Sequence, residues 1–192
     1  MAAAIIGGLL NKNYSPALIR VIESDSKKRL VIENKFKVSS MAEFKKIDKD
    51  EIIVLAVKPQ QAESLLKSIS TEISEQLILS IAAGIQIESI GKWARGHKNI
   101  VRSMPNVCAQ IQLGITALFT KEVLDTKTKL AVEEIVSAIG EFIWLDDESK
   151  MIMTFKLVIP QNKRLNLKDL FPSAIPIHKK GNALYTINAL NM

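Results

Sequence analysis

The chain has 192 residues, and its content of 47% hydrophobic and 24% charged residues is typical of a globular protein and excludes a disordered one. Its single cysteine, Cys108, excludes an intramolecular disulfide and a metal site built from cysteines alone. The two histidines, His97 and His178, have no acidic or cysteine neighbour at metal-ligand spacing, so we expect no metal site.

The formal net charge of +6 is unevenly distributed along the chain. Residues 1–150 carry 20 Lys and Arg against 19 Asp and Glu, whereas residues 151–192 carry six against Asp169 alone. This basic part has no aromatic interleaving, so we expect no nucleic-acid partner. The opening stretch, MAAAIIGGLL, lacks the basic start and cleavage site of a signal peptide, and no stretch approaches the roughly 18 apolar residues of a membrane span. We therefore expect a cytoplasmic protein with no membrane partner.

Short apolar runs alternate with helical patterns along residues 1–150. Runs that predict strands lie at residues 17–22, 35–38, 51–57, 77–82, 100–104, 115–120 and 142–145. Helical patterns lie at residues 25–34, 40–46, 59–73, 87–94 and 123–139. Ser40 and Glu43 form a capping box, Pro59 opens a helix at its first position, and Gly140 ends the last helix. This alternation predicts an α/β fold with a doubly wound, mostly parallel sheet.

The alternation stops near Lys150. Residues 151–192 show neither helical nor strand periodicity over a useful length, and Pro160, Pro172 and Pro176 interrupt any helix. We expect an irregular basic tail there.

Four short stretches stand at predicted strand ends, where a doubly wound fold binds its ligand. They are Ala56-Val57-Lys58-Pro59-Gln60, Ser80-Ile81-Ala82-Ala83-Gly84, Arg102-Ser103-Met104-Pro105-Asn106 and Gly114-Ile115-Thr116-Ala117-Leu118. Their order and spacing over residues 1–150 resemble the N-terminal domain of the pyrroline-5-carboxylate reductase family. The resemblance implies a Rossmann-type domain that binds NADP or NAD. It also implies reduction of the small molecule 1-pyrroline-5-carboxylate to L-proline, the last step of proline biosynthesis.

In that family a strand and turn of the pattern F-I-G-x-G-N-M-A lead into a helix close to A-I-I-x-G-L. Met1-Ala2 matches the end of the pattern and residues 4–9 match the helix, so we expect a sheet that lacks its first strand. That strand is central, between the strands at residues 17–22 and 51–57. Its loss would leave two inner edges with unpaired backbone groups, and we expect the chain to fold poorly.

The family continues into an all-helical domain with an S-G-S-G-P-A-Y motif, which holds the substrate carboxylate and builds the dimer. Residues 151–192 carry no such motif. The resemblance therefore predicts an incomplete dinucleotide-binding domain at residues 1–150. At residues 151–192 the irregular basic tail stands in place of the family's helical domain. We therefore do not assume the family's homo-oligomer, and we name no catalytic side chain. An inactive remnant and a non-catalytic nucleotide-binding module remain the alternatives.

The resemblance implies cofactor contacts at Ser24, Ala56, Val57, Lys58, Pro59, Ala82, Ala83, Pro105 and Asn106. Ser24 would lie beside the adenosine ribose and its 2′-phosphate. Lys27 or Lys28 suits that phosphate and Asp25 does not, so NADP is favoured over NAD, with a solvated helix start as the alternative. Residues 56–59 would lie against a ribose, or form an ordinary strand-to-helix turn. The other four would face the nicotinamide, although Asn106 can instead satisfy backbone groups in a turn.

Overall fold

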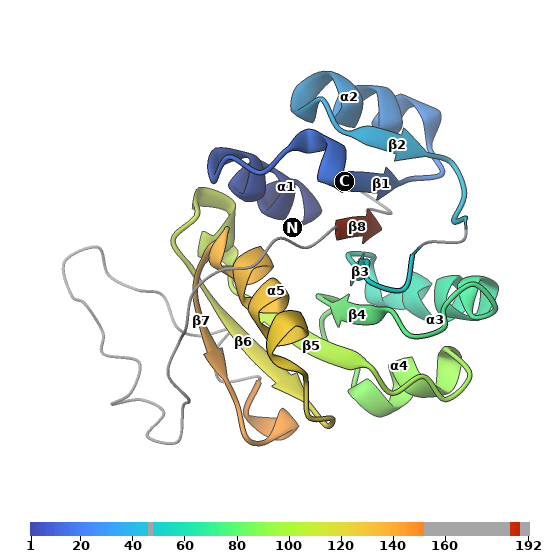
Figure 1. Ribbon diagram of the computed structural model, residues 1–192, viewed down its shortest axis with the longest axis vertical. Coiled ribbons are helices and arrows are strands. Elements are labelled where there is room, and N and C mark those ends of the chain that lie inside the picture. Colours follow the sequence, from blue (N-terminus) through green and yellow to red (C-terminus); the bar gives the residue numbers. More distant parts are fainter. Residues whose placement is uncertain (46–47, 152–184, 189–192) are drawn as a thin grey trace.

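A computed structural model describes residues 1–45, 48–151 and 185–188. Within these residues, eight strands form one sheet in the order β2-β1-β8-β3-β4-β5-β6-β7 (Figure 1). The strands are β1 (Ile19–Ile22), β2 (Ser39–Met41), β3 (Ile52–Leu55), β4 (Leu77–Ser80), β5 (Ile100–Pro105), β6 (Gly114–Thr120), β7 (Gly140–Trp144) and β8 (Tyr185–Asn188). The pair β5–β6 is antiparallel and the other neighbours are parallel. The fold is therefore α/β with a mostly parallel, Rossmann-type sheet.

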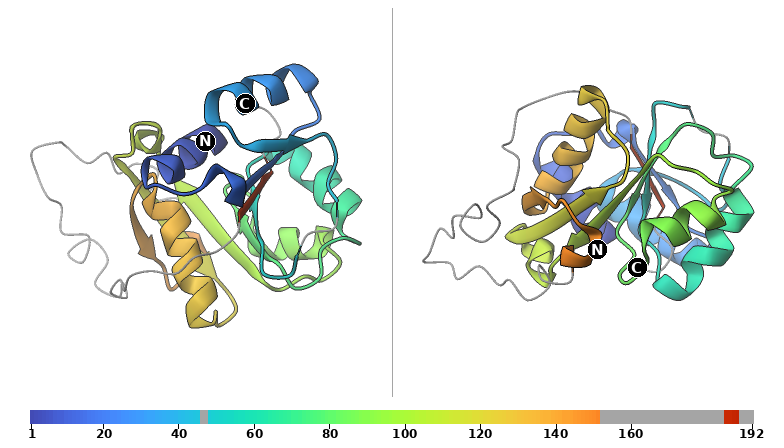
Figure 2. Two further views of the ribbon diagram at one scale, coloured as in Figure 1. Left: turned by 45° about the horizontal axis from the view of Figure 1, so that its top comes forward. Right: turned by 90° about the horizontal axis from the view of Figure 1, so that it is seen from below.

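Helices cover both faces of the sheet (Figure 2). They are α1 (Ala2–Asn11), α2 (Ser26–Phe36), α3 (Pro59–Ile69), α4 (Ile87–Trp93) and α5 (Thr126–Ser137), with short 3-10 helices η1 (Pro16–Leu18), η2 (Val107–Ile111) and η3 (Glu148–Lys150). Helices α1, α2 and α5 share one hydrophobic core with one face, and α3 and α4 share a second core with the other. Across the described part of the chain, no helix has the length and apolar character needed to cross a bilayer.

The central strands are buried on both faces, as their uninterrupted apolar sequences predict. In β3, Ile52 and Val54 belong to the core beneath α1 and α5, whereas Ile53 and Leu55 belong to the core beneath α3. This alternation follows from the two-residue period of a strand. Because both faces of these strands are buried, polar groups and ligands can be accommodated only at the strand ends.

The adjacent glycines of α1 have different surroundings. A Cβ atom on Gly8 would lie 2.1 Å from the backbone oxygen of Ala138, at the end of α5, so only glycine allows the two segments to approach this closely. A Cβ atom on Gly7 would meet nothing nearer than a ring carbon of Phe36 at 3.6 Å, an ordinary contact. Gly8 therefore sets the packing of α1 against α5.

The expectation of two unpaired inner edges is wrong. Strand β8 lies between β1 and β3 and is parallel to both, with Ile187 in register with Val21 on one side and Val54 on the other. Strand β8 is a local element within the part of the chain expected to be irregular or only locally structured, and residues 152–184 and 189–192 lie outside the described residues. The order β2-β1-β8-β3-β4-β5 is the doubly wound arrangement with β8 in the position of the first strand. The physical reason for expecting poor folding is thereby removed.

Two other expectations near residue 40 are corrected. Residues 35–38 do not form a strand, because Lys35 and Phe36 complete α2 and the strand β2 begins at Ser39. No helix starts at Ser40, whose hydroxyl donates to the Glu33 carboxylate at 2.6 Å. Pairing of β2 with β1 satisfies the backbone here, so the capping-box pattern is overridden by a tertiary contact.

Candidate functional site

The parallel strands end along one edge of the sheet. Ile22, Asn188, Leu55, Ser80 and Arg102 form a continuous row of register partners across β1, β8, β3, β4 and β5. Strands β1, β3 and β4 end at this row and β5 ends shortly beyond it, so the segments that follow these four strands gather at the same edge. Together with Pro105, the last residue of β5, they contain all the residues predicted to contact a cofactor, namely Ser24, Ala56, Val57, Lys58, Pro59, Ala82, Ala83, Pro105 and Asn106.

The turn after β1 is tied down through its backbone. Arg29 Nη1 donates to the carbonyl oxygens of Glu23 and Ser24, each at 2.8 Å. The Glu23 carboxylate, only 2% exposed, accepts from the backbone N–H of Asp25 at 3.0 Å. These bonds leave the Ser24 side chain exposed on a fixed turn.

Asp25 caps the start of α2. Its Oδ1 atom accepts from the backbone N–H groups of Lys27 and Lys28 at 2.8 and 3.2 Å. An N-cap carboxylate satisfies donors that have no partner within the helix. Asp25 therefore has a structural role beside the two lysines.

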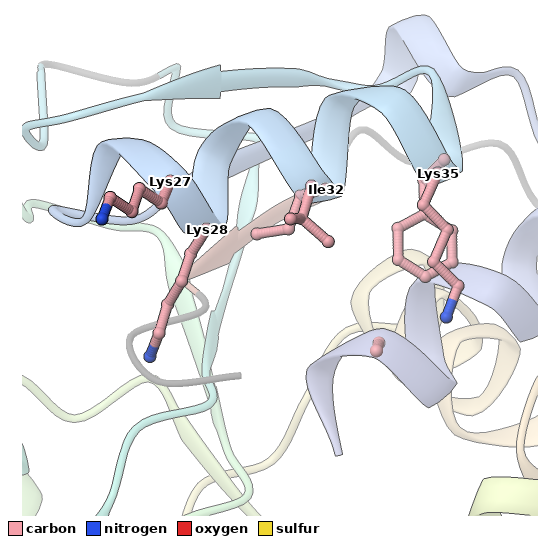
Figure 3. Close-up of a pocket in the computed structure, with 7 residues that line it drawn as sticks. Lys27, Lys28, Ile32 and Lys35 are labelled. Carbon is pink, nitrogen blue, oxygen red and sulfur yellow. The ribbon is translucent and has the colours of Figure 1, made fainter.

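A pocket of about 370 Å³ lies between the first turn of α1 and one face of α2 (Figure 3). Its lining residues are Ala3, Lys27, Lys28, Val31, Ile32, Lys35 and Phe36. Three lysines and four apolar residues line it, and the Lys35 Nζ atom lies 5.1 Å from the centroid of the Phe36 ring. This chemistry suits an anionic group attached to an apolar or aromatic body.

Sequence reasoning identified two of the three lysines and missed Lys35. Lys28, Ile32 and Lys35 are spaced at i, i+4 and i+7, which places them on the same face of a helix. This spacing is a usable signal. The contribution of Ala3 carries no sequence signal, because it depends on how α1 packs beside α2.

The turns after β3 and β4 expose small side chains, and a backbone hydrogen bond links the two turns. Ile81 N–H donates to the Leu55 carbonyl at 3.1 Å, which links the two turns. Ala56 is half-buried and Ala83 is exposed, whereas Val57 and Ala82 are buried in the core beneath α3. Exposed Lys58 and Pro59 open α3 as its N-cap and first residue. Short side chains at such turns allow a ligand to approach the backbone closely.

Asn106 is 1% exposed and bridges the end of β5 to the start of β6. Its Oδ1 atom accepts from Ile115 N–H at 3.2 Å, and its own N–H donates to the Ile115 carbonyl at 3.1 Å. The structure therefore has the turn-stabilising arrangement that was the alternative for this residue. Pro105, which ends β5, is half-buried beside it.

An ion pair that sequence reasoning missed also supports the edge formed by the strand ends. Arg102 Nη1 lies 2.9 Å from Glu148 Oε1, with side chains 8% and 16% exposed. The same carboxylate oxygen accepts from the backbone N–H of Ile87 at 2.9 Å, at the start of α4. Glu148 thus connects η3, β5 and the segment that follows Ala83. No local pattern could indicate it, because the partners are 46 residues apart.

Comparisons with known proteins agree with this architecture. The profile of a family described as NADP oxidoreductase, coenzyme F420-dependent, matches residues 1–84. A pyrroline-5-carboxylate reductase of Haemophilus influenzae is 33% identical over 152 residues, which cover 79% of this chain and 56% of that reductase. The structure of a pyrroline-5-carboxylate reductase from Coxiella burnetii matches with a TM-score of 0.70 at 31% identity, over 78% of this chain and 57% of that one.

Over about four fifths of its length, the chain is similar to pyrroline-5-carboxylate reductases. A further similar protein, the pyrroline carboxylate reductase of Plasmodium falciparum, was solved with NADP bound and matches with a TM-score of 0.60 at 26% identity, over 78% of this chain and 54% of that one. The chain spans about half the length of the curated relatives it matches, 56% for the Haemophilus reductase.

Proposed function

We propose that this chain binds NADPH along the edge formed by the ends of β1, β3, β4 and β5. We further propose that it takes part in the reduction of 1-pyrroline-5-carboxylate to L-proline. The observation that carries the proposal is the gathering of the turns after β1, β3 and β4 at one edge, next to a pocket rimmed by three lysines. The names of the relatives, and the NADP bound to one of them, support it.

The residues present fit a dinucleotide with a 2′-phosphate. Ser24 lies on a turn whose backbone is fixed by Arg29, and it would hold the adenosine ribose. Lys27 and Lys28 would pair with the phosphate, since ammonium groups form strong charge-assisted hydrogen bonds with phosphate oxygens. The small side chains of Ala56 and Ala83 would permit close approach along the edge.

When bound, the reduced nicotinamide would supply the hydride that reduces the C=N bond of the substrate. The described residues would orient the dinucleotide: Ala56–Pro59 against a ribose, and Ala82, Ala83 and Pro105 on the nicotinamide side. Asn106 would act indirectly by holding the end of β5 against β6, because its amide oxygen is already used by Ile115. We assign no catalytic side chain.

A second candidate is a non-catalytic nucleotide-binding module. The distribution of polar groups favours this candidate. The lysine pocket and the fixed turn at Ser24 would both contact the adenosine end of a dinucleotide. The two candidates share the binding step and differ in turnover alone.

The decisive experiment titrates the purified chain with NADPH and NADH, following the fluorescence of Trp93 and Trp144 and the heat of binding. We expect saturable binding of NADPH, and weaker binding of NADH. Absence of binding by either dinucleotide would overturn the proposal. An assay of NADPH oxidation with 1-pyrroline-5-carboxylate then separates the two candidates, because binding without oxidation identifies the non-catalytic module.

A further inference from the structure

We propose that Lys35 marks a second anion-binding position in the lysine pocket between α1 and α2, so that this pocket takes a ligand with two phosphate groups. One phosphate would pair with Lys27 and Lys28, and the other with Lys35 toward the opposite end of α2. The inference rests on the proposed binding of NADPH and deepens it, because it assigns the second position to the diphosphate of the dinucleotide.

The charged residues that line the pocket all have the same sign. Three lysines and four apolar residues line it. The carboxylates on α2 and at its start bind elsewhere: Asp25 accepts from backbone N–H groups, and Glu33 accepts from the Ser40 hydroxyl at 2.6 Å. Two further pockets, of about 250 and 480 Å³, both have Glu75 among their lining residues. A hollow lined by one sign of charge concentrates ions of the opposite sign, so the lysine pocket favours anions.

The three lysines lie toward two ends of the pocket. Lys28 and Lys35 are seven residues apart on α2, which corresponds to about 10 Å along the helix axis. Figure 3 shows Lys27 and Lys28 toward one end of the helix and Lys35 toward the other, with Ile32 between them. The volume of about 370 Å³ falls in the range of roughly 300–1,000 Å³ that accommodates a whole small molecule. A single phosphate group therefore does not fill the pocket or span its two ends.

The Lys35 ammonium group is held beside a fixed aromatic ring. Its Nζ atom lies 5.1 Å from the centroid of the Phe36 ring, a distance at which the ring attracts a cation. Phe36 is 9% exposed and belongs to the core beneath α1 and α5, so the ring cannot move freely. Among the described residues, no carboxylate lies within ion-pair distance of Lys35. Its charge is therefore available to an anion in the pocket.

An apolar stretch separates the two charged ends. Val31 and Ile32 lie between the lysines in the sequence, and both line the pocket together with Ala3 of α1. An uncharged body with a phosphate on each side has the matching order of groups. Adenosine 2′,5′-bisphosphate is the part of NADPH with this character. Its 2′-phosphate would bind at Lys27 and Lys28, and its 5′-phosphate, which is part of the diphosphate in NADPH, at Lys35.

The test is a nitrogen-15 NMR titration of the full chain with adenosine 2′,5′-bisphosphate, adenosine 2′-monophosphate and adenosine 5′-monophosphate. We expect Lys35→Gln to weaken the bisphosphate and the 5′-monophosphate about tenfold, because it removes a charge-assisted hydrogen bond, and to leave the 2′-monophosphate within about twofold. Lys37→Gln removes the same charge outside the pocket and should change none of the three. Unchanged binding of the bisphosphate in Lys35→Gln, an equal loss for the 2′-monophosphate, or an equal effect of Lys37→Gln overturns the proposal.

A second titration, with NADPH and NADH, separates this proposal from the proposed function. Both dinucleotides carry the diphosphate, so Lys35→Gln should weaken them by the same factor. An effect on NADPH alone would place Lys35 at the 2′-phosphate and overturn the second position.

The unmodified chain gives the remaining outcomes. If it binds NADPH but not the bisphosphate, this proposal falls and the proposed function stands. If it binds the bisphosphate but neither dinucleotide, the proposed function falls and the pocket for two phosphates stands. If it binds none of these nucleotides, both are overturned.

Discussion

Arg102 and Glu148 form an ion pair at 2.9 Å that is almost withdrawn from solvent, with side chains 8% and 16% exposed. The Glu148 carboxylate also accepts the backbone N–H of Ile87 at 2.9 Å. One side chain therefore joins a strand, the start of a helix and a distant 3-10 helix. This contact holds the segment after β4 at the edge where we place the dinucleotide.

Removal of this carboxylate should destabilise the fold strongly. Glu148→Ala leaves the Arg102 guanidinium buried without its partner and the Ile87 N–H without an acceptor, so we expect a loss of about 3 kcal/mol in the free energy of unfolding, measured by urea denaturation. The double variant with Arg102→Met should recover much of that loss, because it removes the orphaned charge. Glu63→Ala, which breaks the exposed Lys67–Glu63 pair, is the control and should change stability by less than about 0.5 kcal/mol. Equal effects of Glu148→Ala and Glu63→Ala would contradict this account.

The two glycines of α1 should respond in opposite directions to alanine. Gly8→Ala forces a Cβ atom against the Ala138 carbonyl, so we expect a loss of about 1–3 kcal/mol from overpacking. Gly7→Ala has room, and it should stabilise the helix by up to about 1 kcal/mol through the better helix propensity of alanine. Thermal unfolding of the two variants measures both changes in stability. A destabilised Gly7→Ala with a tolerated Gly8→Ala would show that α1 does not pack on α5 as described.

The start of α5 should contribute a pH-dependent stability. The Thr128 side-chain and backbone donors hold the pKa of Asp125 below its ordinary value of 3.8. Because the folded state binds the proton less tightly than the unfolded state, the stabilisation is present above that ordinary value and disappears as the pH falls through the lower folded pKa. Carbon-13 NMR of the Asp125 carboxyl group should report the lowered midpoint.

Thr128→Ala is the matched variant for this site, because it removes the hydroxyl donor and keeps the backbone donor. We expect the Asp125 midpoint to move back toward 3.8, and the acid-side loss of stability to become smaller. Asp125→Asn should remove this part of the pH dependence. A wild-type midpoint at or above 3.8 would be the contrary result.

Charge removal at the lysine pocket should separate NADPH from NADH. We expect the double variant Lys27→Gln, Lys28→Gln to weaken NADPH binding about tenfold and NADH binding much less, because only NADPH offers the 2′-phosphate. Isothermal titration calorimetry measures both. Lys92→Gln on α4, outside the pocket, removes the same charge and should change neither. If the binding of NADPH and NADH were weakened equally, the lysines would act only through the net charge of the protein and would not contact the 2′-phosphate.

The local sequence was sufficient to predict the regular core and the resemblance to pyrroline-5-carboxylate reductases. The apolar runs that became β3 and β4 are buried on both faces whatever surrounds them, and Pro59 begins α3 as its fixed φ angle predicts. Strand-end motifs such as Ala82-Ala83-Gly84 carried the resemblance because a doubly wound fold places its ligand edge there. Each of these signals lies within a few neighbouring residues.

Tertiary structure alone decided the other features, and the reason is the same for each. Four residues at Tyr185–Asn188 are too few to show a period, and they become a strand because β1 and β3 offer donors and acceptors on both sides. The capping box at Ser40 gave way to pairing with β1, since the energy of that non-local contact outweighs a single local hydrogen bond. A sequence displays the preferences of neighbouring residues, whereas contacts between distant segments exist only once the chain has folded around them.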